Sequence, residues 1–297
     1  MPSVHLREGQ PKDSSEAGLV CYFAFKDVAE KNNMRPELHS ADDSIKAVAS
    51  KLASSHVYSV VAIDKKSGKI LGSNFLHEED HICGVGPISV DPADGQNLGL
   101  GRMLMEDVLR RAAERNKAGV RLLQDCFNMR SLALYSKLGF RGRGTTAVLH
   151  GAVVHAKKGS DVIAIPSGCK TRKCIESDVE ACCKLCVSIH GHDRRNDLMQ
   201  AIEHRKSFVV LREGRITAYT TGLTYNGHSV AESNHDLKAL IVSAGDIMYP
   251  GFHCPVDNGE LLQWCLESGL AITKCMTMMS IGMYNNPSKP YLPSVCF

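Results

Sequence analysis

The spacing of apolar residues along the chain predicts alternating strands and helices. Between Arg102 and about Glu114, apolar residues recur every three to four positions, as on one face of a helix, and charged residues fill the positions between. The apolar run before this helix ends at Asp91-Pro92, where proline cannot continue a strand ladder. A buried strand, a loop and an amphipathic helix are therefore expected in that order.

Extended over the first half of the chain, the same pattern predicts a complete α/β unit, in which a sheet is flanked by helices. The expected elements are strand 3–8, helices 13–32 and 41–54, strands 57–63, 69–76 and 82–90, helix 101–116, strand 120–125, helix 128–138 and strand 144–150.

The second half of the chain repeats this pattern, which predicts two copies of one architecture. The matched segments are Asn128–Gly139 with Asn258–Gly269, Arg7–Asp13 with Arg172–Asp178, and the glycine hairpin 59–72 with 207–218. Small and polar residues at 156–160 favour a connection between the copies. We therefore expect domains at 1–155 and 166–297, with a linker at 156–165.

The loop before helix 101–116 has the chemistry of an anion site. Gly99 and Gly101 leave backbone N–H groups uncovered at a helix start, where the helix dipole also favours negative charge. Arg102 adds a positive charge, although a solvated helix arginine explains that side chain equally well. A glycine pair alone is a weak signal, and a tight turn without a ligand is the alternative.

A second motif lies on helix 128–138. Asn128 suits the N-cap of this helix, and Gly139 suits its left-handed C-cap. Tyr135 follows Asn128 by about two helical turns, so both side chains project from the same side. The alternative interpretation is a cap and a core aromatic with no further role.

Together, the motif Q-x-x-G-x-G at 96–101 and the motif N-x-x-S-x-x-L-Y-x-K-x-G-F at 128–140 resemble the acyl-CoA site of the GNAT acetyltransferase superfamily. The resemblance implies two GNAT-like domains of the α/β (α+β) class, each a central mixed, mostly antiparallel sheet flanked by helices. It also implies an N-acyltransferase that passes an acetyl group from acetyl-CoA directly to an amine in a ternary complex.

The same resemblance implies roles for individual residues. Tyr135 would protonate the departing CoA thiolate, and the backbone of Val90 would pair with the pantetheine arm. The expected cofactor-binding residues are Val90, Gln96, Asn97, Leu98, Gly99, Leu100, Gly101, Arg102, Met103 and Asn128.

The general base stays open at this point. The nearest acidic run in the sequence is Glu78, Glu79, Asp80 and His81, which a solvated hairpin turn would also explain. The terminal carboxylate of Phe297 is a further candidate, because the residues before it are apolar.

The second copy lacks these chemical groups. Cys265 stands at the position equivalent to Tyr135, and the segment Ala231–Leu237 has no glycine pair before its helix. Glu232 and Asp236 in that segment would repel a pyrophosphate. We therefore expect a degenerate, non-catalytic second domain.

Composition narrows the function classes. The chain has 297 residues, 43% hydrophobic and 23% charged, which is typical of a soluble globular protein of two domains. Its net charge of +3 is spread thinly, so a nucleic-acid partner is not expected. No apolar run is long enough to span a bilayer, and residues 1–15 lack the apolar stretch of a signal peptide. We expect a cytoplasmic protein without a membrane partner.

The 12 cysteines are interpreted mainly as reduced core residues. Cys182, Cys183 and Cys186 form a helical stripe with Val179, which favours packing over metal binding despite the nearby His190 and His192. No metal is expected.

Two other functions stay open: a non-catalytic acyl-CoA-binding sensor or scaffold protein, and a redox or metal-responsive protein. The sequence does not identify the acceptor amine, and it is compatible with a monomer or a dimer.

Overall fold

The computed structural model describes residues 4–154 and 163–296, so most of the expected linker at 156–165 lies outside the described residues. The contacts divide the chain into two compact units. Unit 1 runs to Leu122 and adds Phe127–Arg141 and Ser280–Met283. Unit 2 takes Leu123–Cys126, Gly142–Met279 and the residues from Tyr284 onward. Each unit therefore combines segments that are distant in the sequence.

Unit 1 contains a mixed, mostly antiparallel sheet in the order β1-β2-β3-β4-β6. Its strands are β1 (Val4–Glu8), β2 (Val57–Asp64), β3 (Ile70–His77), β4 (Ile82–Val85) and β6 (Gly119–Asp125), and the short β5 (Ser89–Val90) pairs with β3. β4 and β6 are parallel, and the neighbours from β1 to β4 are antiparallel. The β2–β3 turn places Gly68 at a φ of 74°, a left-handed conformation that glycine adopts without strain.

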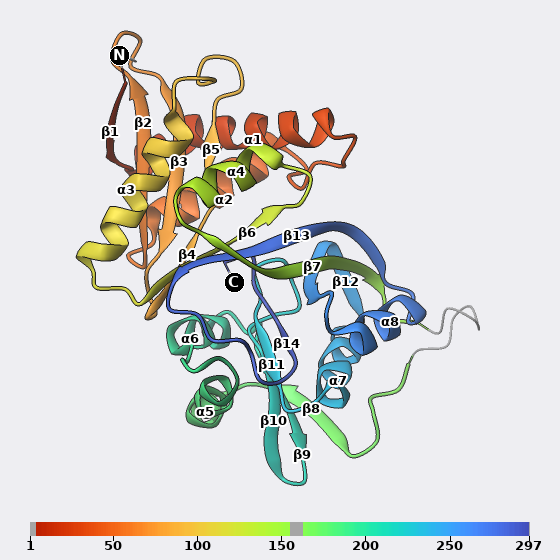
Figure 1. Ribbon diagram of the computed structural model, residues 1–297. Coiled ribbons are helices and arrows are strands. Elements are labelled where there is room, and N and C mark those ends of the chain that lie inside the picture. The colour runs from red at the N-terminus through yellow and green to blue at the C-terminus, as the bar shows by residue number, and fades with distance from the viewer. Residues whose placement is uncertain (1–3, 155–162, 297) are drawn as a thin grey trace. The chain divides into compact units, whose positions relative to one another are not determined.

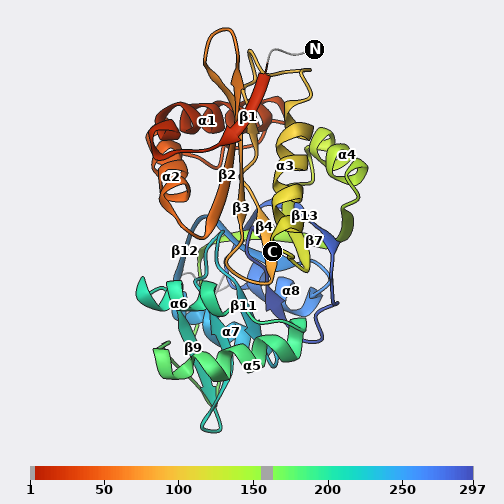
Figure 2. The same cartoon turned by 90° about the vertical axis from the view of Figure 1, so that its left-hand side faces the viewer.

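Helices cover both faces of this sheet (Figure 2). On one face lie α1 (Ser14–Lys31) and α2 (Ala41–Ala53), and on the other lie α3 (Leu100–Glu114) and α4 (Met129–Lys137). Ala17 of α1 packs in one cluster with Val61 and Phe75 of the sheet. On the opposite face, a β-carbon at Gly72 would lie 3.0 Å from Leu104 Cδ1, so α3 approaches β3 closely there.

Unit 2 repeats the plan with a five-stranded sheet in the order β14-β11-β10-β9-β8 (Figure 1). These strands are β14 (Tyr291–Leu292), β11 (Ser229–Ala231), β10 (Arg215–Thr220), β9 (Phe208–Arg212) and β8 (Cys169–Lys173). A second group of strands has the order β13-β7-β12, with β13 (Ala271–Gly282), β7 (Arg141–Ala152) and β12 (Asp246–Pro255). The helices are α5 (Val179–His190), α6 (Arg195–Glu203), α7 (Asn234–Ala244) and α8 (Gly259–Glu267).

Alternation along the strands of unit 2 explains its two apolar clusters. Val209 and Tyr219 pack in a cluster with α5 residues such as Cys182, whereas their neighbours Val210 and Ala218 pack with α7. Successive strand residues point to opposite faces, so each face receives its own helix. The expected α/β fold with helices on both faces of a sheet is confirmed.

The predicted elements of the first half agree with the structure to within a few residues, with one correction. The single strand expected at 82–90 is two strands, β4 and β5, separated at Gly86-Pro87. Pro87 has no N–H to donate to a ladder, and Gly86 has a φ of 138°. Among the described residues, no helix is both long and apolar enough to cross a bilayer.

Candidate functional site

The break between β4 and β5 leaves one edge of β5 outside its pairing with β3. The amide of Asp91 donates to the carbonyl of Leu71 at 2.8 Å, and Ser89 pairs with Ser73. Because backbone groups alternate in direction along a strand, the N–H and C=O of Val90 point away from β3. Within the described chain β5 pairs with β3 alone. The backbone of Val90 can therefore accept an extended partner, the role that the family resemblance implies for it toward the pantetheine arm.

The loop after β5 is shaped by close backbone packing. A β-carbon at Gly95 would lie 2.8 Å from Val90 Cγ1 and 2.9 Å from the Asp91 carbonyl oxygen, so only glycine fits. Asn97 and Gly99 both adopt positive φ, at 62° and 74°. Gly99 is the N-cap of α3, and this left-handed conformation turns the chain into the helix.

The start of α3 presents free backbone donors. The first intrahelical bond runs from the amide of Met103 to the carbonyl of Gly99 at 3.1 Å, so the N–H groups of Gly99 to Arg102 have no acceptor within the helix. Gly99 has no side chain to cap them, and the first turn contains no acidic residue. This geometry suits a phosphate or pyrophosphate.

Two arginines lie at this loop, in different settings. Arg102, which the sequence analysis singled out, is exposed and pairs with Glu106 at 2.7 Å. Arg130, which the sequence analysis missed, lies in the first turn of α4 and donates to Gln96 Oε1 across 34 positions of sequence. No periodicity or motif spacing could have indicated that contact, because it depends on how α4 packs beside the loop.

Helix α4 places Asn128 and Tyr135. Asn128 is the N-cap, and its Oδ1 accepts from the amide of Ser131 at 3.1 Å. The Tyr135 side chain is buried, and its ring centroid lies 6.0 Å from that of Phe140. A β-carbon at Gly101 would lie 3.4 Å from Leu134 Cδ2, so α4 packs against the first turn of α3. The structure therefore brings the predicted loop and the predicted helix together.

Glu78, the first residue of the acidic run 78–81, serves the fold. The carboxylate of Glu78 accepts two hydrogen bonds from Arg111, at 2.9 and 2.6 Å. Burial tends to raise the pKa of Glu78, but the hydrogen bonds and charge of Arg111, with Arg115 and Lys117, outweigh it and lower that pKa. A carboxylate stabilised in this way is a weak base. His81 is exposed, and Phe297 lies outside the described residues.

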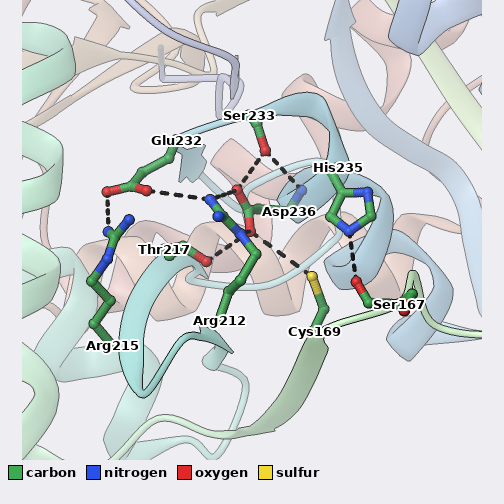
Figure 3. Close-up of polar contacts among 9 residues, drawn as sticks. All are labelled: Ser167, Cys169, Arg212, Arg215, Thr217, Glu232, Ser233, His235 and Asp236. Atoms are coloured by element: carbon green, nitrogen blue, oxygen red, sulfur yellow. Dashed lines mark hydrogen bonds and ion pairs between the residues drawn. The ribbon is translucent and has the colours of Figure 1, made fainter.

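At the corresponding helix start in unit 2, acidic side chains form a network of internal polar contacts (Figure 3). Asp236, in the first turn of α7, is fully buried and accepts from Ser233 Oγ at 2.6 Å, Thr217 Oγ1 at 2.7 Å and Arg212 Nε at 3.0 Å. Glu232 accepts from both Arg212 and Arg215. The start of α7 is thus capped by Ser233 Oγ, which accepts from the amide of Asp236, and its first turn carries a buried carboxylate that opposes an anion electrostatically.

The strand before α7 is also covered. β11 pairs on one side with β10 and on the other with β14, with Val230 opposite Tyr291 and the amide of Ala231 donating to the Pro290 carbonyl at 3.0 Å. β11 precedes α7 as β5 precedes α3, so β14 takes the edge that stays available on β5. The sequence analysis missed this, because a two-residue strand has no detectable period.

The cysteines of unit 2 agree with the core interpretation. Cys182, Cys183 and Cys186 are buried free thiols. Burial raises the pKa of Cys265, at the position equivalent to Tyr135, to about 12, so this thiol stays protonated. Within residues 4–154 and 163–296, no group of three or more His, Cys, Asp or Glu side chains is arranged to hold a metal ion.

Comparison with known proteins points to one family. Residues 25–140 match the model of the acetyltransferase (GNAT) family. A Pyrococcus horikoshii protein assigned as an acetyltransferase is 15% identical and aligns over 95% of this chain and 90% of its own, with a TM-score of 0.71. An N-acetyltransferase from Sphaerobacter thermophilus is 12% identical over 96% and 98% of the two chains, with a TM-score of 0.60.

A tandem GNAT protein from the clavulanic acid biosynthesis pathway is also 12% identical, over 94% of this chain and 98% of its own, with a TM-score of 0.56. At these identities the likeness establishes the fold, including its tandem arrangement. No curated protein matches the chain.

Proposed function

We propose that this chain, whose residues 25–140 match the GNAT acetyltransferase family model, is an N-acyltransferase that passes an acetyl group from acetyl-CoA to an amine. The observation that carries the proposal is the start of α3, where the N–H groups of Gly99 to Arg102 are uncapped and no acid is present. Within the described residues of unit 2 the start of α7 differs, since Ser233 caps it and its first turn contains Asp236. We assign catalysis to unit 1 and a non-catalytic role to unit 2.

The co-substrate is held by backbone more than by side chains. The pyrophosphate binds the amides at the start of α3, and the pantetheine arm extends along β5 and pairs with Val90. Asn128 holds the start of α4, which packs against that loop. The cofactor-binding set is thus Val90, residues 96–103 and Asn128.

The transfer needs no covalent enzyme intermediate. The neutral amine attacks the thioester carbonyl, a C–N bond forms, and the C–S bond breaks. Tyr135 gives its hydroxyl proton to the departing thiolate, and the proton lost by the amine restores the phenol through solvent. Glu78 is unsuited to take the proton of the amine, because Arg111 stabilises its charged form.

Calorimetric titration with acetyl-CoA tests the site. Gly99 has a φ of 74° with open space around it, and Gly214, in the β9–β10 turn, has a φ of 76° and equally open space. Gly99→Glu and Gly214→Glu therefore impose the same backbone strain and the same added charge. We expect the first to weaken binding at least tenfold, since it brings a carboxylate to the anion site, and the second to leave binding unchanged.

Equal losses in both variants would show that the effect is not specific to the loop. A folded wild-type protein that binds no acetyl-CoA would overturn the proposed function. Binding without turnover of any amine would favour the alternative of an acyl-CoA sensor or scaffold.

A further inference from the structure

At the phosphate loop, Arg130 is bonded to a neutral side chain and not to a carboxylate. Its exposed guanidinium donates to the neutral amide oxygen of Gln96. No acidic residue lies in the first turn of α4. Arg102, by contrast, is neutralised by Glu106. Among the described residues Arg130 has no ion pair with a carboxylate, so it adds a positive charge beside the loop, held in place by a partner that an anion can displace.

The second copy reverses the charge at this position. Asn128-Met129-Arg130 aligns with Asn258-Gly259-Glu260, so a glutamate stands where unit 1 has its arginine. The carboxylate of Glu260 accepts from Lys238 at 2.7 Å and from Asn234 at 2.7 Å, and Lys238 and Asn234 are both on α7. In unit 2, which lacks the phosphate loop, Glu260 therefore links the start of α8 to α7. In unit 1, which keeps the loop, the equivalent residue is the basic Arg130.

CoA carries a pyrophosphate and a ribose 3′-phosphate, and the starts of α3 and α4 offer each of them a different binding group. The amides of Gly99 to Arg102 suit the pyrophosphate, whereas Arg130 contacts Gln96 at the beginning of the loop, outside that first turn. A ribose 3′-phosphate is a separate dianion with the geometry for a bidentate guanidinium contact.

We propose that Arg130 leaves Gln96 and binds the 3′-phosphate of CoA, so that the protein selects CoA over dephospho-CoA. This inference rests on the proposed function, because it assigns one phosphate of the same co-substrate. In the absence of CoA, Gln96 holds the guanidinium of Arg130 in position. Once CoA is bound, Gln96 contributes little to the affinity.

Titration of wild type and variants with CoA and with dephospho-CoA, at one fixed ionic strength, tests this inference. We expect wild type to prefer CoA by about tenfold or more. Arg130→Gln should bring the two affinities within about threefold by weakening CoA alone. The matched control is Arg110→Gln, which removes the same charge from α3 where Arg110 pairs with Asp107 and Glu114, and it should keep the preference.

The outcomes separate the two proposals. If Arg130→Gln keeps the wild-type preference, or weakens both ligands equally, the 3′-phosphate assignment is wrong while acyl-CoA binding stands. If wild type binds neither ligand, the proposed function itself fails. Arg130→Lys, which keeps the charge without the bidentate geometry, should retain part of the preference.

Discussion

Tyr135 combines two roles at the scale of a single residue. Its ring packs against Phe140 in the core of unit 1, and its hydroxyl is the proposed proton donor to the CoA thiolate. Removing only the hydroxyl separates these roles, because phenylalanine keeps the ring and its packing.

We predict that Tyr135→Phe lowers kcat by about a hundredfold or more and leaves the Kd for acetyl-CoA unchanged, since a general acid typically contributes that much. Steady-state kinetics with the best acceptor from an amine panel measure the effect. Tyr58→Phe is the control: the hydroxyl of Tyr58 donates to Asp107 at 2.7 Å, so its loss should reduce stability by about 1 kcal/mol without changing kcat. An unchanged kcat in Tyr135→Phe would remove Tyr135 from the chemistry.

Residues whose roles depend on local chain geometry could be identified from the sequence. Asn128 as a helix cap, and Gly99 as one of two glycines that leave amides uncovered before a helix, both follow from neighbours within four positions. Arg130 could not be identified, since its partner Gln96 is brought to it by helix packing. The charge at Glu78 could not be interpreted either, because Arg111 approaches it from another element.

At the scale of elements, the two copies differ in what covers the strand before the third helix. β5 pairs with β3 alone within the described chain, whereas β11 is covered by β14. Apolar periodicity could predict the long helices and strands, since burial of one face imposes it. It could not predict β5 as a separate strand or β14 as a partner, because elements of two residues are defined by long-range pairing.

We predict that ending the chain after Ser288, which removes β14, lowers stability and causes self-association through the exposed edge of β11. No second acetyl-CoA should bind, because Ser233 still caps the start of α7 and the buried Asp236 carboxylate stays in its first turn. Light scattering, urea unfolding and calorimetric stoichiometry measure the three effects.

Leu292→Ala is the matched variant, since it keeps the strand but empties a buried position in the α7 cluster. It should cost about 2–4 kcal/mol without self-association. A truncated chain that stays monomeric and binds two molecules of acetyl-CoA would contradict the account of unit 2.

At the scale of the whole molecule, both units contain the same arginine–aspartate ion pair between their first strand and their first helix. Arg7 of β1 holds Asp13, at the start of α1, with two hydrogen bonds of 2.7 and 2.8 Å. Arg172 of β8 holds Asp178, at the start of α5, with bonds of 2.5 and 2.9 Å. Each aspartate also accepts from a backbone amide three residues earlier, of Gln10 or Ile175. The sequence similarity of these two segments therefore reflects a shared clamp between the first strand and the first helix.

The clamps make stability depend on pH in a defined direction. Hydrogen bonds from Arg7 and Arg172 lower the pKa of Asp13 and Asp178 in the folded state, against the opposing effect of burial. A carboxyl whose folded pKa is lowered contributes its stability above the unfolded pKa of about 3.9 and loses it as the pH falls through the folded pKa.

We predict that Asp13→Asn and Asp178→Asn each cost about 1–3 kcal/mol at pH 7 and much less near pH 2. Urea unfolding across this pH range measures the cost, with Asp27→Asn, from the exposed pair with Lys31, as a control that should cost under about 0.5 kcal/mol. A penalty that persists at pH 2 would mean that the clamps act through packing and not through charge.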